Sequence, residues 1–297
     1  MSHFVLEIGT EKELSERFAA ALGEADLHFD EMAVSATPRR ALLHLRGLAD
    51  MQPLREEVAL GPSLKAAYDA EGKPSKAAMG FARGQGVELS ALFTQETEKG
   101  SYVAARKTVG GASAQDVLKN VVPSVISALS FPKRMRWGSG SFAYARPMHW
   151  IVALLDGEVV PFAVGNVKSG RVTCGHRVHG PGPFEVAHAD DMDAVLAEKC
   201  RIVASGMARR ETIVAGGDAR AAAIGGRVLW NDALLSEVEG LVEHPVPLLG
   251  DFDPVFLELP REVLLTSMET HQKSFGVEDG EGRLMPHFLT VLNLDPE

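Results

Sequence analysis

Cysteine and long apolar runs are both scarce in this sequence. Cys174 and Cys200 are the only cysteines, too few for a disulfide framework, which is typical of a protein in a reducing cytoplasm. No stretch approaches the roughly 20 apolar residues that a membrane helix needs, and the best apolar run, residues 150–155, has the length of a strand. Glu7 lies where a secretory signal would have its apolar centre. We therefore expect a cytoplasmic protein that makes no membrane contact.

Common nucleotide-binding and catalytic motifs are also missing. The sequence has no Gly-x-x-x-x-Gly-Lys-Ser/Thr loop, and its Gly-x-Gly pairs lack the third glycine of a dinucleotide-binding fold. It has no Gly-x-Ser-x-Gly elbow, and neither cysteine has a local catalytic signature. We expect no catalytic residue and no cofactor site in this chain.

Acidic residues outnumber basic ones, 40 to 30, but the two kinds are unevenly placed. The net charge of −10 argues against simple coating of nucleic acid, because non-specific binding depends on neutralising phosphates. Residues 131–180, however, hold seven basic and two acidic side chains, whereas residues 181–297 hold nine basic and 21 acidic ones. A basic window of net charge +5 therefore precedes an acidic stretch of net charge −12.

The hydrophobic patterns predict helices and strands without a regular alternation. Strands are expected over 4–8, 27–36, 40–48, 102–108, 148–155, 158–164 and 287–292, and helices over 11–22, 72–84, 113–129, 190–199, 205–215, 231–240 and 257–271. Turns are expected at residues 37–39, 61–62 and 216–226. This mixture favours an α+β fold, with mainly antiparallel sheets and packed helices, over a doubly wound sheet. We expect two subdomains, residues 1–130 and 131–297.

The basic window contains the segment with the most chemical character. Lys133, Arg134 and Arg136 lie beside Trp137, an arrangement suited to phosphate contact with an aromatic ring nearby for stacking. Arg146 and His149 follow in a second cluster of cations and aromatic residues. An arginine and tryptophan surface that only packs by cation–π contacts is an equally good interpretation at this stage.

Soft and borderline metal ligands gather further on, at Cys174, His176, His179, His188 and Cys200. The spacing contains neither a Cys-x-x-Cys pair nor a His-Glu-x-x-His motif. A turn flanked by glycines, in which the histidines pack or bond to the backbone, explains the residues equally simply. We expect no metal.

Two other groups allow both a functional and a plain interpretation. Glu237, Glu239 and Glu243 could supply a general base, but a solvated helix face accounts for them. The segment 271–273, His-Gln-Lys, could bind an anion, but cationic residues in a last helical turn are also expected from the helix dipole.

Seven motifs stand in a recognisable order and together span almost the whole chain. They are Leu6-Glu-Ile-Gly-Thr-Glu11, Thr37-Pro-Arg-Arg40, Phe131-Pro-Lys-Arg-Met-Arg-Trp-Gly138, Ala145-Arg-Pro-Met-His-Trp150, Gly175-His-Arg177, Leu241-Val-Glu-His-Pro-Val246 and Ser267-Met-Glu-Thr-His-Gln-Lys-Ser-Phe275. In this order they resemble the N-terminal part of the bacterial glycyl-tRNA synthetase β subunit.

The resemblance implies a share in joining glycine to its tRNA with ATP. In that family an α subunit holds the active site that uses ATP and magnesium, and the β subunit of an α₂β₂ assembly supplies tRNA recognition. The chain would then be non-catalytic by itself, with the α subunit and tRNA(Gly) as partners and no DNA. The RNA-binding candidates are Lys133, Arg134, Arg136, Trp137, Arg146, His149, His176 and Arg177. The alternative is a docking module that never contacts RNA, for which the acidic stretch 181–297 could face a basic partner.

Two departures from the family pattern bound what the resemblance implies. A segment is expected to be missing after Glu11, where the family continues with Glu-Leu-Pro and a further helical stretch. The family's β subunit is also more than twice as long, with an HD-type domain and an anticodon-binding domain beyond the region matched here. Anticodon recognition is therefore not expected from these residues.

Overall fold

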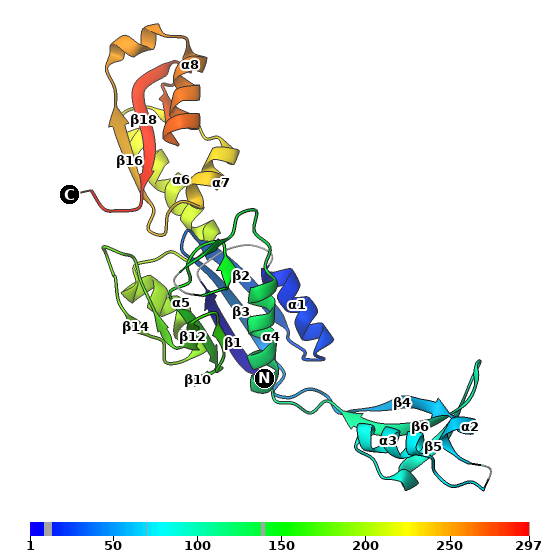
Figure 1. Ribbon diagram of the computed structural model, residues 1–297. Helices are drawn as coiled ribbons and strands as arrows, with labels where there is room; N and C mark the ends of the chain where they lie inside the picture. Colours follow the sequence, from blue (N-terminus) through cyan, green and yellow to red (C-terminus); the bar gives the residue numbers. More distant parts are fainter. Residues whose placement is uncertain (9–13, 70, 138–139, 297) are drawn as a thin grey trace. The chain divides into compact units, whose positions relative to one another are not determined.

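The computed structural model describes residues 1–8, 14–69, 71–137 and 140–296 of the 297-residue chain. The described elements form two compact units (Figure 1). Unit 1 comprises residues 1–24, 28–49 and 115–297, and unit 2 comprises residues 25–27 and 50–114. Helices are mixed with mostly antiparallel strands, which confirms the predicted α+β class. The boundary expected at residue 130 lies inside unit 1, because strands on either side of it pair in one sheet.

A seven-stranded sheet forms the core of unit 1, in the order β11-β12-β9-β1-β3-β2, with β10 paired to β9. All of its neighbours are antiparallel except β12 and β9. Its strands are β1 (Ser2–Ile8), β2 (Glu31–Thr37), β3 (Arg40–Leu48), β9 (Ile151–Leu155), β10 (Glu158–Val159), β11 (Ala163–Val164) and β12 (Val167–Gly170). Two short hairpins accompany it, β7 (Met135–Arg136) with β8 (Ala143–Tyr144) and β13 (Val172–Thr173) with β14 (Phe184–Glu185).

Strand β1 lies inside the seven-stranded sheet, between β9 and β3, and its apolar side chains are buried on both faces of the sheet. Phe4 stacks on Phe18 of helix α1 (Leu14–Glu24), and helix α4 (Ala114–Ala128) lies beside α1 (Figure 1). On the other face, Val5 packs with β9 and with the helical segment 189–199. That segment consists of η2 (Ala189–Asp191), α5 (Met192–Ala194) and η3 (Val195–Lys199). Burial of apolar surface on both faces of the sheet stabilises this lobe.

The C-terminal part of unit 1, residues 205–296, has a four-stranded antiparallel sheet and a separate core; we call it the C-terminal lobe. The strand order is β15-β17-β18-β16, and the core side chains come from these strands and from helices α6 and α7. Its elements are α6 (Gly206–Ala223), β15 (Arg227–Val228), α7 (Asp232–Glu239), β16 (Val246–Asp251), η4 (Pro254–Glu258), α8 (Arg261–Thr266), η5 (Ser267–His271), β17 (Phe275–Glu278) and β18 (Leu284–Leu292).

Unit 2 is a small sheet with short helices. The strands β4 (Arg55–Ser63), β6 (Gly100–Val109) and β5 (Leu92–Thr97) pair in that order, all antiparallel. Its helices are α2 (Leu64–Ala67), α3 (Lys76–Gln85) and η1 (Leu89–Ala91). The chain enters and leaves the unit along paired backbones, since the Gln52 N–H donates to the Ala112 carbonyl at 2.9 Å and the Ala114 N–H to the Asp50 carbonyl at 2.8 Å.

Most expected elements are present, and three expectations were wrong. The stretch 216–223 continues helix α6 instead of turning, because the absent side chains of Gly216 and Gly217 let the helix pack closely. A Cβ at Gly217 would lie 2.6 Å from a methyl carbon of Leu289. Residues 61 and 62 belong to β4, where a register shift accommodates them. The strand expected over 158–164 is broken into β10 and β11, which pair with different strands.

The part of the chain that the structure describes has no helix with both the length and the apolar character needed to cross a bilayer. The segment expected to be missing after Glu11 falls within residues 9–13, which lie outside the described residues.

Candidate nucleic-acid interface

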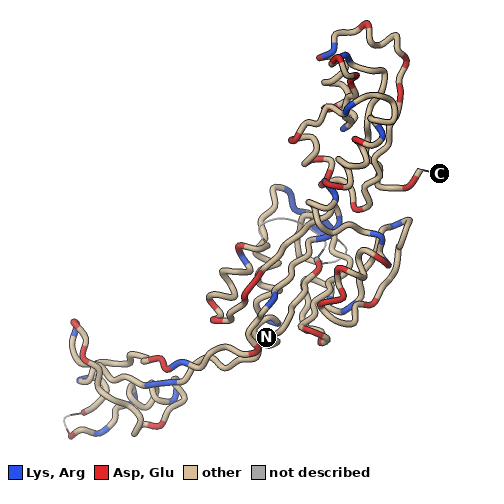
Figure 2. Tube along the Cα trace, turned by 180° about the vertical axis from the view of Figure 1, so that it is seen from behind, with Lys and Arg blue, Asp and Glu red and all other residues tan. Residues whose placement is uncertain are grey.

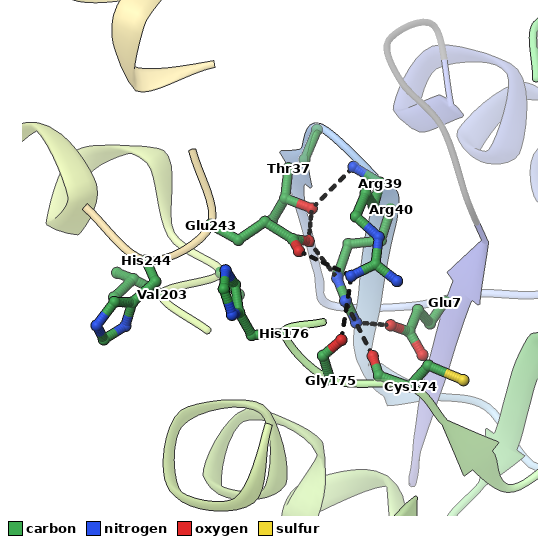
Figure 3. Close-up of polar contacts among 12 residues, drawn as sticks. Glu7, Thr37, Arg39, Arg40, Cys174, Gly175, His176, Val203, Glu243 and His244 are labelled. Carbon is green, nitrogen blue, oxygen red and sulfur yellow. Dashed lines mark hydrogen bonds and ion pairs between the residues drawn. The ribbon is translucent and has the colours of Figure 1, made fainter. Parts of the chain in front are cut away.

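A fully buried arginine joins the sheet of unit 1 to the C-terminal lobe. Arg40 begins strand β3 directly after the two-residue turn 38–39, and its guanidinium lies between two buried carboxylates (Figure 3). Its Nη1 donates to Oε1 of Glu7 on β1, and its Nε donates to Oε1 of Glu243 at 3.0 Å. Its Nη2 donates to the Cys174 carbonyl at 3.0 Å. All three nitrogens of a charge that has lost contact with water are therefore paired.

The turn residues strengthen this joint. The Thr37 hydroxyl donates to Oε1 of Glu243 at 2.6 Å. Arg39 Nη1 lies 3.4 Å from Oε2 of Glu243 and donates to the Gly175 carbonyl at 3.1 Å. We call Glu7, Thr37, Arg39, Arg40 and Glu243 the Arg40 cluster. It ties β1, the β2–β3 turn and the 174–175 loop to residue 243, which precedes β16.

Trp150 connects the Arg40 cluster to the surface. Its indole N–H donates to Oε2 of Glu7 at 2.9 Å, so Glu7 accepts from Arg40 on one oxygen and from Trp150 on the other. The guanidinium carbons of Arg39 and Arg40 lie 5.8 and 5.5 Å from the centre of the ring, within the range of a cation–π contact.

The electrostatics explain why Arg40 stays charged inside the protein. Burial by itself would lower the pKa of Arg40, but the carboxylates of Glu7 and Glu243 outweigh it and raise the pKa above its ordinary value. The expectation that Glu243 belongs to a solvated helix face was wrong. Helix α7 ends at Glu239, and Glu243 lies beyond it, 1% exposed and paired with Arg40.

A basic pocket of about 470 Å³ opens beside the Arg40 cluster. It is lined by Pro38, Arg39, Met135, Ala145, Arg146, Pro147, His149, Trp150 and Arg177. Three of these residues are arginines, Arg39, Arg146 and Arg177, and a fourth is His149. None of the described residues that line the pocket is Asp or Glu. Figure 2 shows basic positions gathered at the end of the seven-stranded sheet that is nearest the C-terminal lobe. Arginine side chains around an aromatic ring suit phosphate and nucleobase contact.

The structure divides the predicted RNA-binding residues into two groups. Arg146, His149 and Arg177 come together in the basic pocket, although 31 positions separate the first from the last. Lys133, Arg134 and Arg136 are exposed but do not line it; their neighbour Met135 does. Trp137 is half-buried and packs edge-on against Phe142 at 6.0 Å.

His176 lies under the surface. Its ring is 2% exposed, and its Nδ1 accepts the backbone N–H of His179 at 3.2 Å. Burial, and then the neighbouring His179, lowers the pKa of His176, so the ring is neutral at pH 7. In this position it shapes the turn that presents Arg177 to the pocket.

The turn itself depends on glycine. A Cβ on Gly175 would lie 1.9 Å from the Gly180 carbonyl oxygen and 2.7 Å from Cα of Cys200. Both are backbone atoms, which cannot move aside as the end of a side chain can. The Gly175-His176-Arg177 motif therefore combines a position that excludes side chains, a buried ring and an exposed cation.

The remaining sites weighed from the sequence have ordinary surroundings. Cys200 lies in the core, where burial raises the pKa of its thiol to about 11, and burial likewise raises the pKa of Cys174. Glu237, weighed as a general base, and Lys273, weighed as an anion ligand, form an ion pair with each other at 2.9 Å on the surface. His188 accepts the backbone N–H of Asp190 and begins the η2 turn.

Sequence reasoning missed two residues of the pocket, Arg39 and Trp150, and misassigned Glu243, which it weighed only as a general base or as part of a solvated helix face. The structure brings Arg39 and Glu243 together across 204 positions and bonds Trp150 to Glu7. For Arg39 and Trp150, membership in a quoted motif was the only signal that could have singled them out.

Comparisons with known proteins agree over the whole chain. The family described as "Glycyl-tRNA synthetase beta subunit" matches residues 5–297. The glycine–tRNA ligase beta subunit of Nitratidesulfovibrio vulgaris (strain DP4) is 56% identical over 307 residues and is matched along 100% of this chain. Those of Oleidesulfovibrio alaskensis and Lawsonia intracellularis are 54% and 44% identical, also along 100% of the chain. The chain spans 44% of the length of each of these curated relatives.

Proposed function

The chain belongs to the glycyl-tRNA synthetase beta subunit family, and we propose that it serves the ATP-dependent attachment of glycine to tRNA by binding tRNA(Gly) at the basic pocket. The chain contributes binding and no catalytic group. ATP and magnesium are used by the α subunit of an α₂β₂ assembly in the cytoplasm, where the charged tRNA is consumed.

The observation that carries this proposal is the composition of the basic pocket. Arg39, Arg146 and Arg177 converge there from three separate segments in a protein whose net charge is −10. A local field of this kind attracts a polyanion even when the total charge is negative. Because arginine donates in a planar fork, it can hold a phosphate through two parallel hydrogen bonds.

The Arg40 cluster fixes the side chains of two residues that line the pocket. Arg39 is held by Glu243 and by the Gly175 carbonyl, and Trp150 is held by Glu7. A binding surface whose side chains are fixed before the ligand arrives pays less conformational entropy on binding. Lys133, Arg134 and Arg136 extend the basic surface next to Met135 and are proposed to contact phosphates further along the RNA.

The test is tRNA(Gly) binding by the assembled enzyme at several salt concentrations, measured by fluorescence anisotropy. The double variant Arg146→Ala/Arg177→Ala should lose about tenfold or more in affinity. The slope of log affinity against log salt should fall by about 0.7–0.9 for each phosphate contact removed.

The matched control is Lys168→Ala/Arg220→Ala, which removes two exposed cations of unit 1 that lie outside the pocket. It should leave affinity and slope close to those of the unsubstituted enzyme. Equal effects in the two double variants would show that only net charge matters. No effect in the pocket variant would refute RNA binding at this site.

Docking of the α subunit is a second candidate role, favoured by an exposed apolar face on the C-terminal lobe. Five apolar side chains between residues 255 and 263 are each at least 36% exposed, namely Val255, Phe256, Leu257, Leu259 and Val263. They adjoin a pocket of about 430 Å³ whose lining includes Phe252, Phe256 and Phe288. Exposed apolar patches of this kind are typical of protein interfaces.

Co-expression with the α subunit tests this role. Phe256→Asp/Val263→Asp in the full-length β subunit should abolish co-purification. Met207→Asp, which charges a 72% exposed apolar residue on α6, should not. Retention of the complex by the double variant would remove this face as the docking site while leaving the tRNA proposal intact.

A further inference from the structure

Three side chains with metal-binding atoms meet at one point of unit 1, and none of them lines the basic pocket. His179 lies in the loop after β13, His244 lies between α7 and β16, and Asp295 follows β18. One ligand atom from each residue lies within 4.8 Å of the others. His244 Nε2 is 3.5 Å from Oδ1 of Asp295, and His179 Nε2 is 3.6 Å from Oδ2.

The two measured separations involve different oxygens of Asp295, and both are longer than a direct hydrogen bond, which leaves room for a shared cation. Hydrogen bonds between a ring nitrogen and a carboxylate measure about 2.7–3.2 Å. Ligand atoms held about 2.0–2.1 Å from a tetrahedral zinc ion lie roughly 3.3–3.5 Å from one another. The Asp295 backbone N–H now donates to His179 Nε2 at 3.1 Å, and a metal–nitrogen bond would replace that contact.

The scaffold around two of the ligands is already fixed. The Asn293 side-chain oxygen accepts the backbone N–H groups of Glu243 and His244 at 2.7 and 2.9 Å. The ring of His179 stacks on that of His176 at 4.9 Å, with 17° between the planes. Asn293 thus fixes the backbone at His244, and the stack fixes the ring plane of His179, so less conformational entropy is lost when an ion binds.

The site is also accessible. The side chains of His179 and His244 are 20% and 26% exposed, and that of Asp295 is 63% exposed. An ion could therefore enter from solvent, and water could complete its coordination. Two imidazoles with one carboxylate suit zinc and similar borderline ions, whereas calcium and magnesium prefer oxygen ligands alone.

We propose that His179, His244 and Asp295 bind a divalent ion of the zinc class. The ion fastens the 174–180 loop, the segment before β16 and the segment after β18 to one another. Because Arg177 lies on the first of these segments, the same ion steadies one wall of the basic pocket. The proposal depends on the geometry of these three residues and is independent of RNA binding.

The first experiment is calorimetric titration of the metal-free, untagged chain with zinc chloride at pH 7.5. We expect one ion per chain with micromolar or tighter affinity. His244→Ala and Asp295→Asn should each weaken it by at least about tenfold. His188→Ala is the control, since this exposed histidine also lies beside a carboxylate, that of Asp190, but outside the cluster; its affinity should be unchanged.

The second experiment uses cobalt as a spectroscopic probe of the same chain. Cobalt bound by these ligands should give the intense visible absorption of tetrahedral coordination, and His179→Ala should abolish it while circular dichroism shows an intact fold. Absence of stoichiometric zinc binding would overturn the proposal. So would zinc binding that survives both histidine substitutions, because the ion would then lie elsewhere.

Discussion

The Arg40 cluster and the basic pocket share Arg39 and are connected by Trp150, yet they use arginine in different ways. In the cluster, Arg40 is buried and paired with two carboxylates, Glu7 on β1 and Glu243 in the C-terminal lobe. Its charge therefore stabilises the contact between the seven-stranded sheet and that lobe. In the pocket, Arg146 and Arg177 are exposed and no described acidic residue lines the space beside them. The difference teaches that consecutive cations can have different surroundings: Arg40 is enclosed and serves the structure alone, whereas Arg39 pairs with Glu243 and also lines the pocket.

The largest expected effect comes from removing the enclosed charge. Arg40→Met would leave Glu7 buried without a cation and Glu243 with only Arg39, whose Nη1 lies 3.4 Å from Oε2, so the free energy of unfolding should fall by about 3–5 kcal/mol. Urea denaturation of the chain, followed by tryptophan fluorescence, measures it. Arg146→Met is the control, and its exposed position predicts a change within about 0.5 kcal/mol. Equal losses would erase the distinction between the two regions.

A smaller effect is expected at Trp150, the pocket residue that bonds to the Arg40 cluster. Trp150→Phe keeps an aromatic ring but loses the N–H that bonds to Glu7, and it weakens the contacts with Arg39 and Arg40. We expect the free energy of unfolding to fall by about 1–2 kcal/mol. Affinity for tRNA should fall as well, because Trp150 lines the pocket. A loss of stability with unchanged affinity would assign Trp150 to the cluster alone.

The smallest expected effect is a pH dependence of stability that comes from a buried histidine. Burial lowers the pKa of His176 below its ordinary 6.5, so the unfolded chain binds a proton more readily than the folded one. Its stabilising contribution is therefore complete above pH 6.5 and is lost as the pH falls below that value. His3, whose pKa burial also lowers, acts in the same direction.

Thermal unfolding between pH 7.5 and pH 5.5 measures this dependence. His176→Gln should flatten the profile, because it removes the buried imidazole. A profile in which stability rises towards pH 5.5 would contradict the expected sign.

The sequence predicts the local elements well and the long-range pairing poorly. The pattern around β1, the Pro38 turn and the amphipathic stripe of α4 each contain enough local information to define an element. Where Gly216 and Gly217 permit a close approach of helix to sheet, composition suggested a turn, because the neighbours that fill the space are distant in sequence.

The candidate site shows the same limit. Arg146 and His149 could be selected from their charge and from the aromatic residues around them. The role of Glu243 could not be predicted, because its partner Arg40 is 203 positions away. The residues around Glu243 in the sequence do not indicate that it pairs with a buried cation. Charge patterns identify what is exposed, whereas the pairing of buried charges depends on the tertiary fold.

The paired backbone segments at which the chain enters and leaves unit 2 have a consequence for how the protein unfolds. Residues 52 and 112 are hydrogen-bonded to each other, so the excursion between them begins and ends at the same place. For unit 1, residues 52–112 therefore act as a closed loop. The entropy cost of closing a loop rises only slowly with its length, so the size of this excursion has little effect on the stability of unit 1. We therefore expect residues 52–112 to unfold as a separate cooperative block while β1 and β3 stay paired. A protease cut within it would nick the protein without dismantling the sheet that carries Arg40.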